Sequence, residues 1–196
     1  MNPKKLIAAA AVAAAFATPV LAQTTGSEVQ RNVNQQQRIE QGLQSGQLNT
    51  REAARLEGEE ARVEKMESRA LKDGKLSPDE RGRIDRAQNQ VSRDIYREKH
   101  DAQVGNPNSP SSQRMQADVQ RNINQQQRIE QGVQNGSLTN REVGKLERGQ
   151  ARDNAQQSRA GRDGYVGPNE QRRIQNAENT QSRRIYRQKH DAQTRQ

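Results

Sequence analysis

The stretch that decides the fold is DGKLSPDE at residues 73–80, where one helix stops and the next begins. Gly74 can adopt the positive φ that ends many helices. Ser77 is a favoured N-cap, Pro78 suits the first helical position, and Glu80 stands where its carboxylate can reach back to the N–H of the cap. We therefore predict a helix that ends near residue 71 and another that begins at residue 78.

Related stretches divide the rest of the chain at regular intervals. They occupy residues 45–52, 135–142 and 163–170, and each pairs a glycine with a later glutamate at position 52, 142 or 170. Apolar residues recur at helical spacing between them, most clearly at Ile84, Val91 and Ile95. We expect an all-α fold with helices over residues 28–44, 50–71, 78–101, 118–134, 140–161 and 168–191.

The chain is an internal duplication. Val29 aligns with Val119 and Ile95 with Ile185, both pairs 90 positions apart, without a gap between them. This indicates equal folds, so we predict two tandem three-helix modules, residues 27–103 and 117–193, joined by a Pro/Ser/Asn-rich linker at residues 104–116. Because the apolar stripes of the second module are thinner, we expect it to melt first, in a transition of its own.

The N-terminal segment is typical of a secretory signal. Residues 1–22 contain Lys4 and Lys5, an apolar run over residues 6–17, and small residues before a cleavage point after Ala22. The apolar run is shorter than the roughly 20 residues that span a bilayer. We therefore expect a periplasmic or secreted protein without a membrane-spanning segment in the mature chain.

Composition argues against an enzyme. The 196 residues include 33 Lys and Arg against 24 Asp and Glu, for a net charge of +9, with no Cys, no Trp and one Phe. Thiol chemistry is excluded, no phosphate-cradling glycine motif is present, and no cofactor is expected. Glu57, Glu59 and Glu60 alternate with Arg55 and Arg62, a spacing that predicts a solvated helix surface.

Two resemblances concern the loops and the module. Residues 73–80 resemble the second half of an EF-hand calcium loop, and are similar to a turn of TerB-like metal-stress proteins, but Arg69 and Leu71 stand where the loop needs oxygen ligands. We therefore expect calcium to leave stability unchanged. Each module also resembles small exported Gln- and Arg-rich proteobacterial proteins that end in Tyr-Arg-x-Lys-His-Asp, which implies export and the module boundaries.

A basic stripe is the first candidate binding surface. Arg86, Arg93 and Arg97 fall on the face of their helix opposite the apolar stripe, and Arg183 and Arg187 are the equivalents in the second module. Such a stripe can bind the phosphates of lipopolysaccharide, anionic lipid or nucleic acid. The scarcity of aromatic residues disfavours base stacking and therefore sequence-specific recognition. The alternative interpretation is a surface charged for solubility.

The histidines suggest a second candidate. His100-Asp101 and His190-Asp191 lie at equivalent positions, and modules that met there would bring two imidazoles and two carboxylates to one zinc or copper ion. Alternatively, each histidine only complements the dipole at the end of a helix.

Together these patterns predict an exported, non-enzymatic helical binding or stress-associated accessory protein with a polyanionic partner. The alternative is a periplasmic metal-cation-binding protein that uses the His-Asp pairs or the EF-hand-like loops.

Overall fold

The computed structural model describes residues 20–193, and side chains from residue 25 onward. Six α-helices and two short 3₁₀ turns make up the described elements, without any strand among them, which confirms the all-α expectation. The elements are α1 (Val20–Ser45), α2 (Thr50–Ala70), η1 (Leu71–Asp73), α3 (Pro78–Lys99), α4 (Pro110–Gln134), α5 (Asn140–Ala160), η2 (Gly161–Asp163) and α6 (Pro168–Lys189). The predicted signal segment falls almost wholly on residues 1–19, outside the described part of the chain.

The helix boundaries follow the capping signals. Asn49 and Ser77 accept hydrogen bonds from backbone N–H groups of α2 and α3, and the third residues of those helices, Glu52 and Glu80, accept the cap N–H groups in return. Gly74 adopts φ 89° after the 3₁₀ turn that follows α2. These local interactions explain why the starts of these helices fall where the sequence predicts them.

The helix α4 begins earlier than predicted. Ser109 caps it and Pro110 occupies its first turn, so residues 110–116, predicted as linker, are helical. Met115 and Ser112 are buried there. The Ser-Pro pair is the same start signal as at Ser77, which the linker composition around it concealed.

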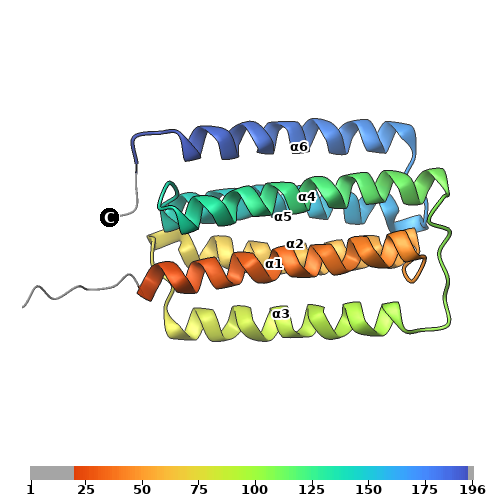
Figure 1. Cartoon of the computed structure of the whole chain (residues 1–196), viewed down its shortest axis with the longest axis horizontal. Coiled ribbons are helices and arrows are strands. Elements are labelled where there is room, and N and C mark those ends of the chain that lie inside the picture. The colour runs from red at the N-terminus through yellow and green to blue at the C-terminus, as the bar shows by residue number, and fades with distance from the viewer. Residues whose placement is uncertain (1–19, 194–196) are drawn as a thin grey trace, which may run out of the picture.

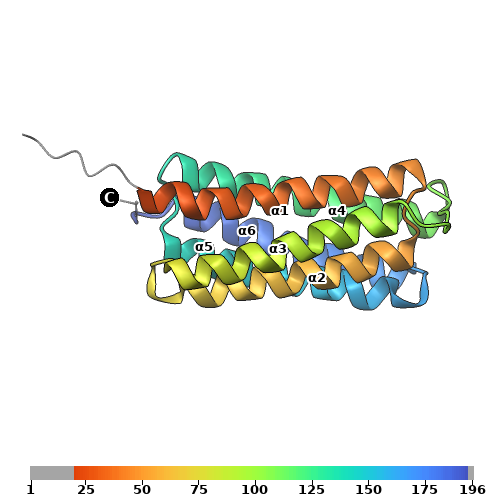
Figure 2. The ribbon, with the colours of Figure 1, turned by 90° about the horizontal axis from the view of Figure 1, so that it is seen from below.

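Four helices form the inner bundle and two lie outside it. The helices α2 and α5 pack antiparallel, as do α1 and α4, while α3 covers α1 and α2 on one side and α6 covers α4 and α5 on the opposite side (Figures 1 and 2). Arg51 donates to the carbonyl oxygen of Asp163 at 2.9 Å, and Arg141, its equivalent, contacts that of Asp73 at 3.3 Å. The two sequence halves therefore hold each other by reciprocal contacts.

The apolar core consists of two clusters, and both draw on both halves of the chain. In the first, Ile39 and Leu43 join Met115 and Ile174. In the second, Val29 and Ile84 join Ile129 and Ile185. The two halves of the chain thus share their hydrophobic core.

No helix within residues 20–193 is long and apolar enough to cross a membrane.

Candidate functional site

A basic groove runs between the antiparallel helices α2 and α5. Arg62, Lys65 and Arg69 line it from α2, at spacings that place them on one helix face. Arg148, Arg152 and Arg159 line it from α5. The groove has a volume of about 630 Å³, and small residues, among them Gly58, Ala61, Ala151 and Ala155, complete its walls. Small residues let the two backbones approach while the long cationic side chains reach outward.

A second groove adjoins the first. It lies between α5 and α6, has a volume of about 450 Å³, and shares Arg148 and Arg152 with the groove between α2 and α5. The two grooves together form a surface that we call the basic face, whose cations are Arg62, Lys65, Arg69, Lys145, Arg148, Arg152, Arg159, Arg184 and Arg187.

The cations of the basic face are poorly neutralised. None of the ion pairs formed by the described side chains includes any of them. The carboxyl group of Asp153 interacts electrostatically with Arg184 and Arg152, but its burial raises its pKa to about 7. Uncompensated cations that line a groove attract an anionic partner.

The five predicted arginines do not form one stripe. All are exposed, but Arg86, Arg93 and Arg97 belong to α3, and Arg183 and Arg187 to α6, on the opposite side of the bundle (Figure 1). Of these five, Arg187 belongs to the basic face.

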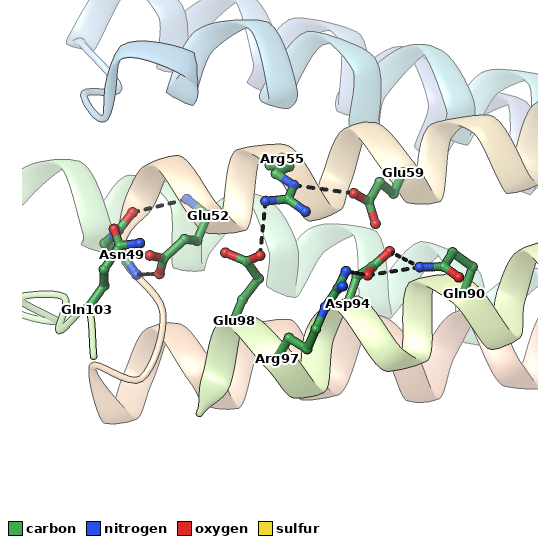
Figure 3. A network of polar contacts seen from close by, with 9 residues as sticks. All are labelled: Asn49, Glu52, Arg55, Glu59, Gln90, Asp94, Arg97, Glu98 and Gln103. Atoms are coloured by element: carbon green, nitrogen blue, oxygen red, sulfur yellow. Dashed lines mark hydrogen bonds and ion pairs between the residues drawn. The ribbon is translucent and has the colours of Figure 1, made fainter. Parts of the chain in front are cut away.

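Neighbours on the same helices engage three of them. Arg97 forms an ion pair with Asp94 (Figure 3), Arg93 donates to Gln90 at 2.5 Å, and Arg183 donates to Thr180 at 3.1 Å. The basic face escaped the sequence analysis because its cations come from three helices. The spacing of Arg62, Lys65 and Arg69 was the available signal.

The histidines do not meet. His100 and His190 cap the C-terminal ends of α3 and α6, which lie at opposite ends of the bundle (Figure 1). In each, Nδ1 lies 2.7 Å from the carbonyl oxygen of a tyrosine four residues earlier, and the two rings stack. Asp101 and Asp191 follow them at the same two ends, so the shared zinc or copper ion is not formed within one chain.

A layer of buried carboxyl groups lies on the inner face of α2. Glu57, Glu60, Glu64 and Glu67 are each at most 2% exposed. The expectation of a solvated surface was therefore wrong for Glu57 and Glu60. Their spacing of three and four residues points them toward the neighbouring helices of the bundle. Glu59 also has only 15% of its side chain exposed, and it pairs with Arg55.

Side-chain amides satisfy part of this layer. Asn32 donates to Glu67 at 2.9 Å, and Gln36 donates to Glu57 at 3.0 Å. Asn154 of α5 donates to Glu64 at 2.9 Å. Hydrogen bonds from amides favour the charged form of a carboxyl group, although they add no positive charge.

Burial without cations shifts these carboxyl groups toward their neutral form. No described Lys or Arg side chain is buried. Burial raises the pKa of Glu57 to about 8 and that of Glu147 to about 7. Burial, and then repulsion by Glu57 and other glutamates, holds the pKa of Glu60 well above its usual range, and neither of its carboxyl oxygens has a hydrogen-bond partner. The folded chain therefore takes up protons that the unfolded chain releases.

Comparison with protein families, curated proteins and solved structures finds no match to this chain.

Proposed function

We propose that this chain is a non-enzymatic binding protein whose basic face binds an extended, phosphate-bearing polyanion. The observation that carries the proposal is a pair of adjoining grooves with nine cations and no ion-paired carboxylate among them. Guanidinium groups donate two parallel hydrogen bonds to a phosphate, which suits arginine to this chemistry.

The shape of the basic face favours a linear ligand. Arg148 and Arg152 lie where the two grooves adjoin, so a chain of phosphates in either groove reaches them. Tyr96, Tyr165 and Tyr186 are exposed, but none lines the basic face. Without aromatic platforms the recognition rests on phosphates rather than on bases.

The proposed setting is the periplasm or the exterior of the cell. It rests on the signal-like residues 1–22, whereas the accessory role proposed from the sequence rests on the polar helical faces.

The test compares two double variants that each remove two positive charges. Arg148→Gln with Arg152→Gln alters the basic face, whereas Arg86→Gln with Arg93→Gln alters exposed arginines of α3. Titration with short inorganic polyphosphate and with a DNA duplex should show an affinity loss of about tenfold or more for the first variant only. Its salt dependence should also flatten, because each lost contact lowers the slope of log K by about 0.7–0.9.

Two outcomes would contradict the proposal. Equal losses of affinity in both variants would mean that binding depends only on the net charge of the protein. Wild-type binding to anionic vesicles but not to polyphosphate would indicate a flat lipid surface in place of a linear chain.

A further inference from the structure

Three carboxyl groups converge where the start of α2 meets the end of α3. Glu52, Glu98 and Asp101 each offer one oxygen, and these three oxygens all lie within 4.8 Å of one another. Figure 3 shows Glu52 and Glu98 approaching from the two helices, with Asn49 and Gln103 beside them. Neither histidine is part of this cluster.

Glu52, one of the three, has a buried carboxyl oxygen without a hydrogen-bond partner. Its Oε2 accepts the backbone N–H of Asn49 at 2.9 Å, which fixes the carboxylate. Its Oε1 is buried and has no hydrogen-bond partner, and the residue as a whole is 5% exposed. An acceptor that has lost water and found no donor is costly, and a bound cation removes that cost.

The local charge is negative. Burial raises the pKa of Glu52, and the charges of Asp101 and Glu98 raise it further. The guanidinium of Arg55 lies 3.0 Å from Glu98, but Arg55 also pairs with Glu59. The single positive charge of Arg55 therefore does not neutralise all the carboxylates around it.

The second half of the chain provides an internal comparison. Glu142 corresponds to Glu52, and its Oε1 is likewise buried and without a partner. Gln188, however, stands in the position of Glu98, and its amide donates to Asp191 at 3.1 Å. The second half therefore lacks a counterpart of the Glu98 carboxylate, and the carboxylate of Asp191 already accepts an N–H group.

We propose that Glu52, Glu98 and Asp101 bind one hard divalent cation of the Ca²⁺ or Mn²⁺ type, and that the equivalent position in the second half does not. Carboxylate oxygens are the ligands that these ions prefer, whereas zinc and copper favour nitrogen or sulfur. Asp101 is exposed, which leaves room for water to complete the coordination. This site is separate from the basic face and does not depend on the proposed function. Because an ion that binds the folded chain stabilises it, the site would make calcium stabilising, contrary to the expectation drawn from the loop at residues 73–80.

The experiment titrates the full chain with Mn²⁺ and follows free Mn²⁺ by electron paramagnetic resonance. The wild type should bind one ion. Glu98→Gln, which copies Gln188, should weaken binding by about tenfold or more, because affinity depends on the number of charged ligands. Gln188→Glu, which copies Glu98, should add a second site. Arg55→Gln should tighten binding, because it removes the competing cation.

Glu59→Gln is the matched control, since it removes a carboxylate that pairs with Arg55 but lies outside the cluster. Its effect should stay within about threefold, as expected of a neighbouring charge partly screened by solvent. Circular dichroism confirms that each variant is folded. Displacement by Ca²⁺, together with paramagnetic broadening confined to residues near Glu52 and Asp101, would support the site. Wild-type affinity in Glu98→Gln, or a chain that binds no Mn²⁺ at millimolar concentration, would overturn the proposal.

Discussion

The two halves of the chain differ most in where they carry charge. Equivalent positions around the helices α2 and α3 of the first half and α5 and α6 of the second hold Glu59, Asp94 and Glu98 in the first half and Gly149, Arg184 and Gln188 in the second. The first half therefore forms the ion pairs of Figure 3, among them Arg55 with Glu98, whereas the second half contributes unpaired cations to the basic face. A few differences between the two halves therefore give equivalent positions opposite charges or remove a charge.

The same division extends into the interior. The equivalent positions hold Glu60, Glu64 and Glu67 in the first half, and Gln150, Asn154 and Gln157 in the second. Glu64 and Asn154 bond to each other directly, although they are the same position of the repeat. At these three positions the first half supplies carboxyl groups and the second half supplies amides.

Separating the halves should have the largest effect. Residues 1–103 and 104–196, produced alone, should each lack a cooperative thermal transition, because both apolar clusters need Ile39 and Ile174, or Ile84 and Ile185, together. Mixing the halves should restore helicity measured by circular dichroism, and the intact chain should melt in one transition. Cooperative melting of each half alone would instead support the two independent modules predicted from the sequence.

Raising the pH should destabilise the intact protein. The pKa values of Glu57 and Glu178 are raised to about 8, chiefly by burial, from an ordinary value of 4.5. Between these pH values the folded state binds more protons, so the free energy of unfolding falls as the pH rises and levels off above pH 8. Each pKa unit corresponds to about 1.4 kcal/mol, so Tm should drop by about 10 °C or more between pH 5 and pH 8.

A variant can measure the share of this pH dependence that comes from Glu60. Glu60→Gln, which copies Gln150, should flatten the dependence of Tm on pH, since the pKa of Glu60 is raised well above its usual range. A flat profile in the wild type would show that the buried carboxyl groups have other means of neutralisation.

Exchanging one surface position should move anion binding by a smaller amount. Arg184→Asp copies Asp94 and should weaken polyphosphate binding by about tenfold, because it removes one contact and adds a repelling charge. Asp94→Arg should release Arg97 from its ion pair and should strengthen binding on the first half. Calorimetric titrations of both variants measure the two changes. Unaltered affinity in Arg184→Asp would place the ligand elsewhere.

The sequence predicted the helices well because their signals are local. Ser77 with Glu80, and Thr139 with Glu142, form capping interactions within four residues, and the structure contains them. The starts of α1 and α4 are the exceptions. The helix α1 begins at Val20 rather than at residue 28, and Pro110 begins α4 with the same start signal inside a stretch of linker composition.

The sites were hidden because they depend on tertiary packing. The spacing of Glu57 and Glu60 fits a solvated face as well as an inner face, and only the positions of Asn154 and Gln36 distinguish the two. Likewise, the carboxylate cluster combines Glu52 of α2 with Glu98 of α3 and the adjacent Asp101. The sequence alone does not show that these residues lie close together.

The smallest predicted effect concerns two neighbouring positions at which the halves of the chain differ. Gly149 stands where the first half has Glu59, and Gln181 stands where it has Val91. A Cβ on Gly149 would overlap Oε1 of Gln181, whose amide donates to the carbonyl oxygen of Leu146 at 2.8 Å. Gly149→Ala should therefore displace a buried amide and destabilise the protein by about 1–2 kcal/mol.

In the background of Gln181→Val, Gly149→Ala should instead stabilise the protein by about 0.5–1 kcal/mol, the usual gain when alanine replaces glycine within a helix. Gly82→Ala in α3 is the control, because a Cβ there meets its nearest neighbour, Arg86, at an ordinary 3.5 Å. Urea denaturation of the single and double variants measures the coupling between the two positions. A coupling energy near zero would mean that Gly149 and Gln181 affect stability independently of each other.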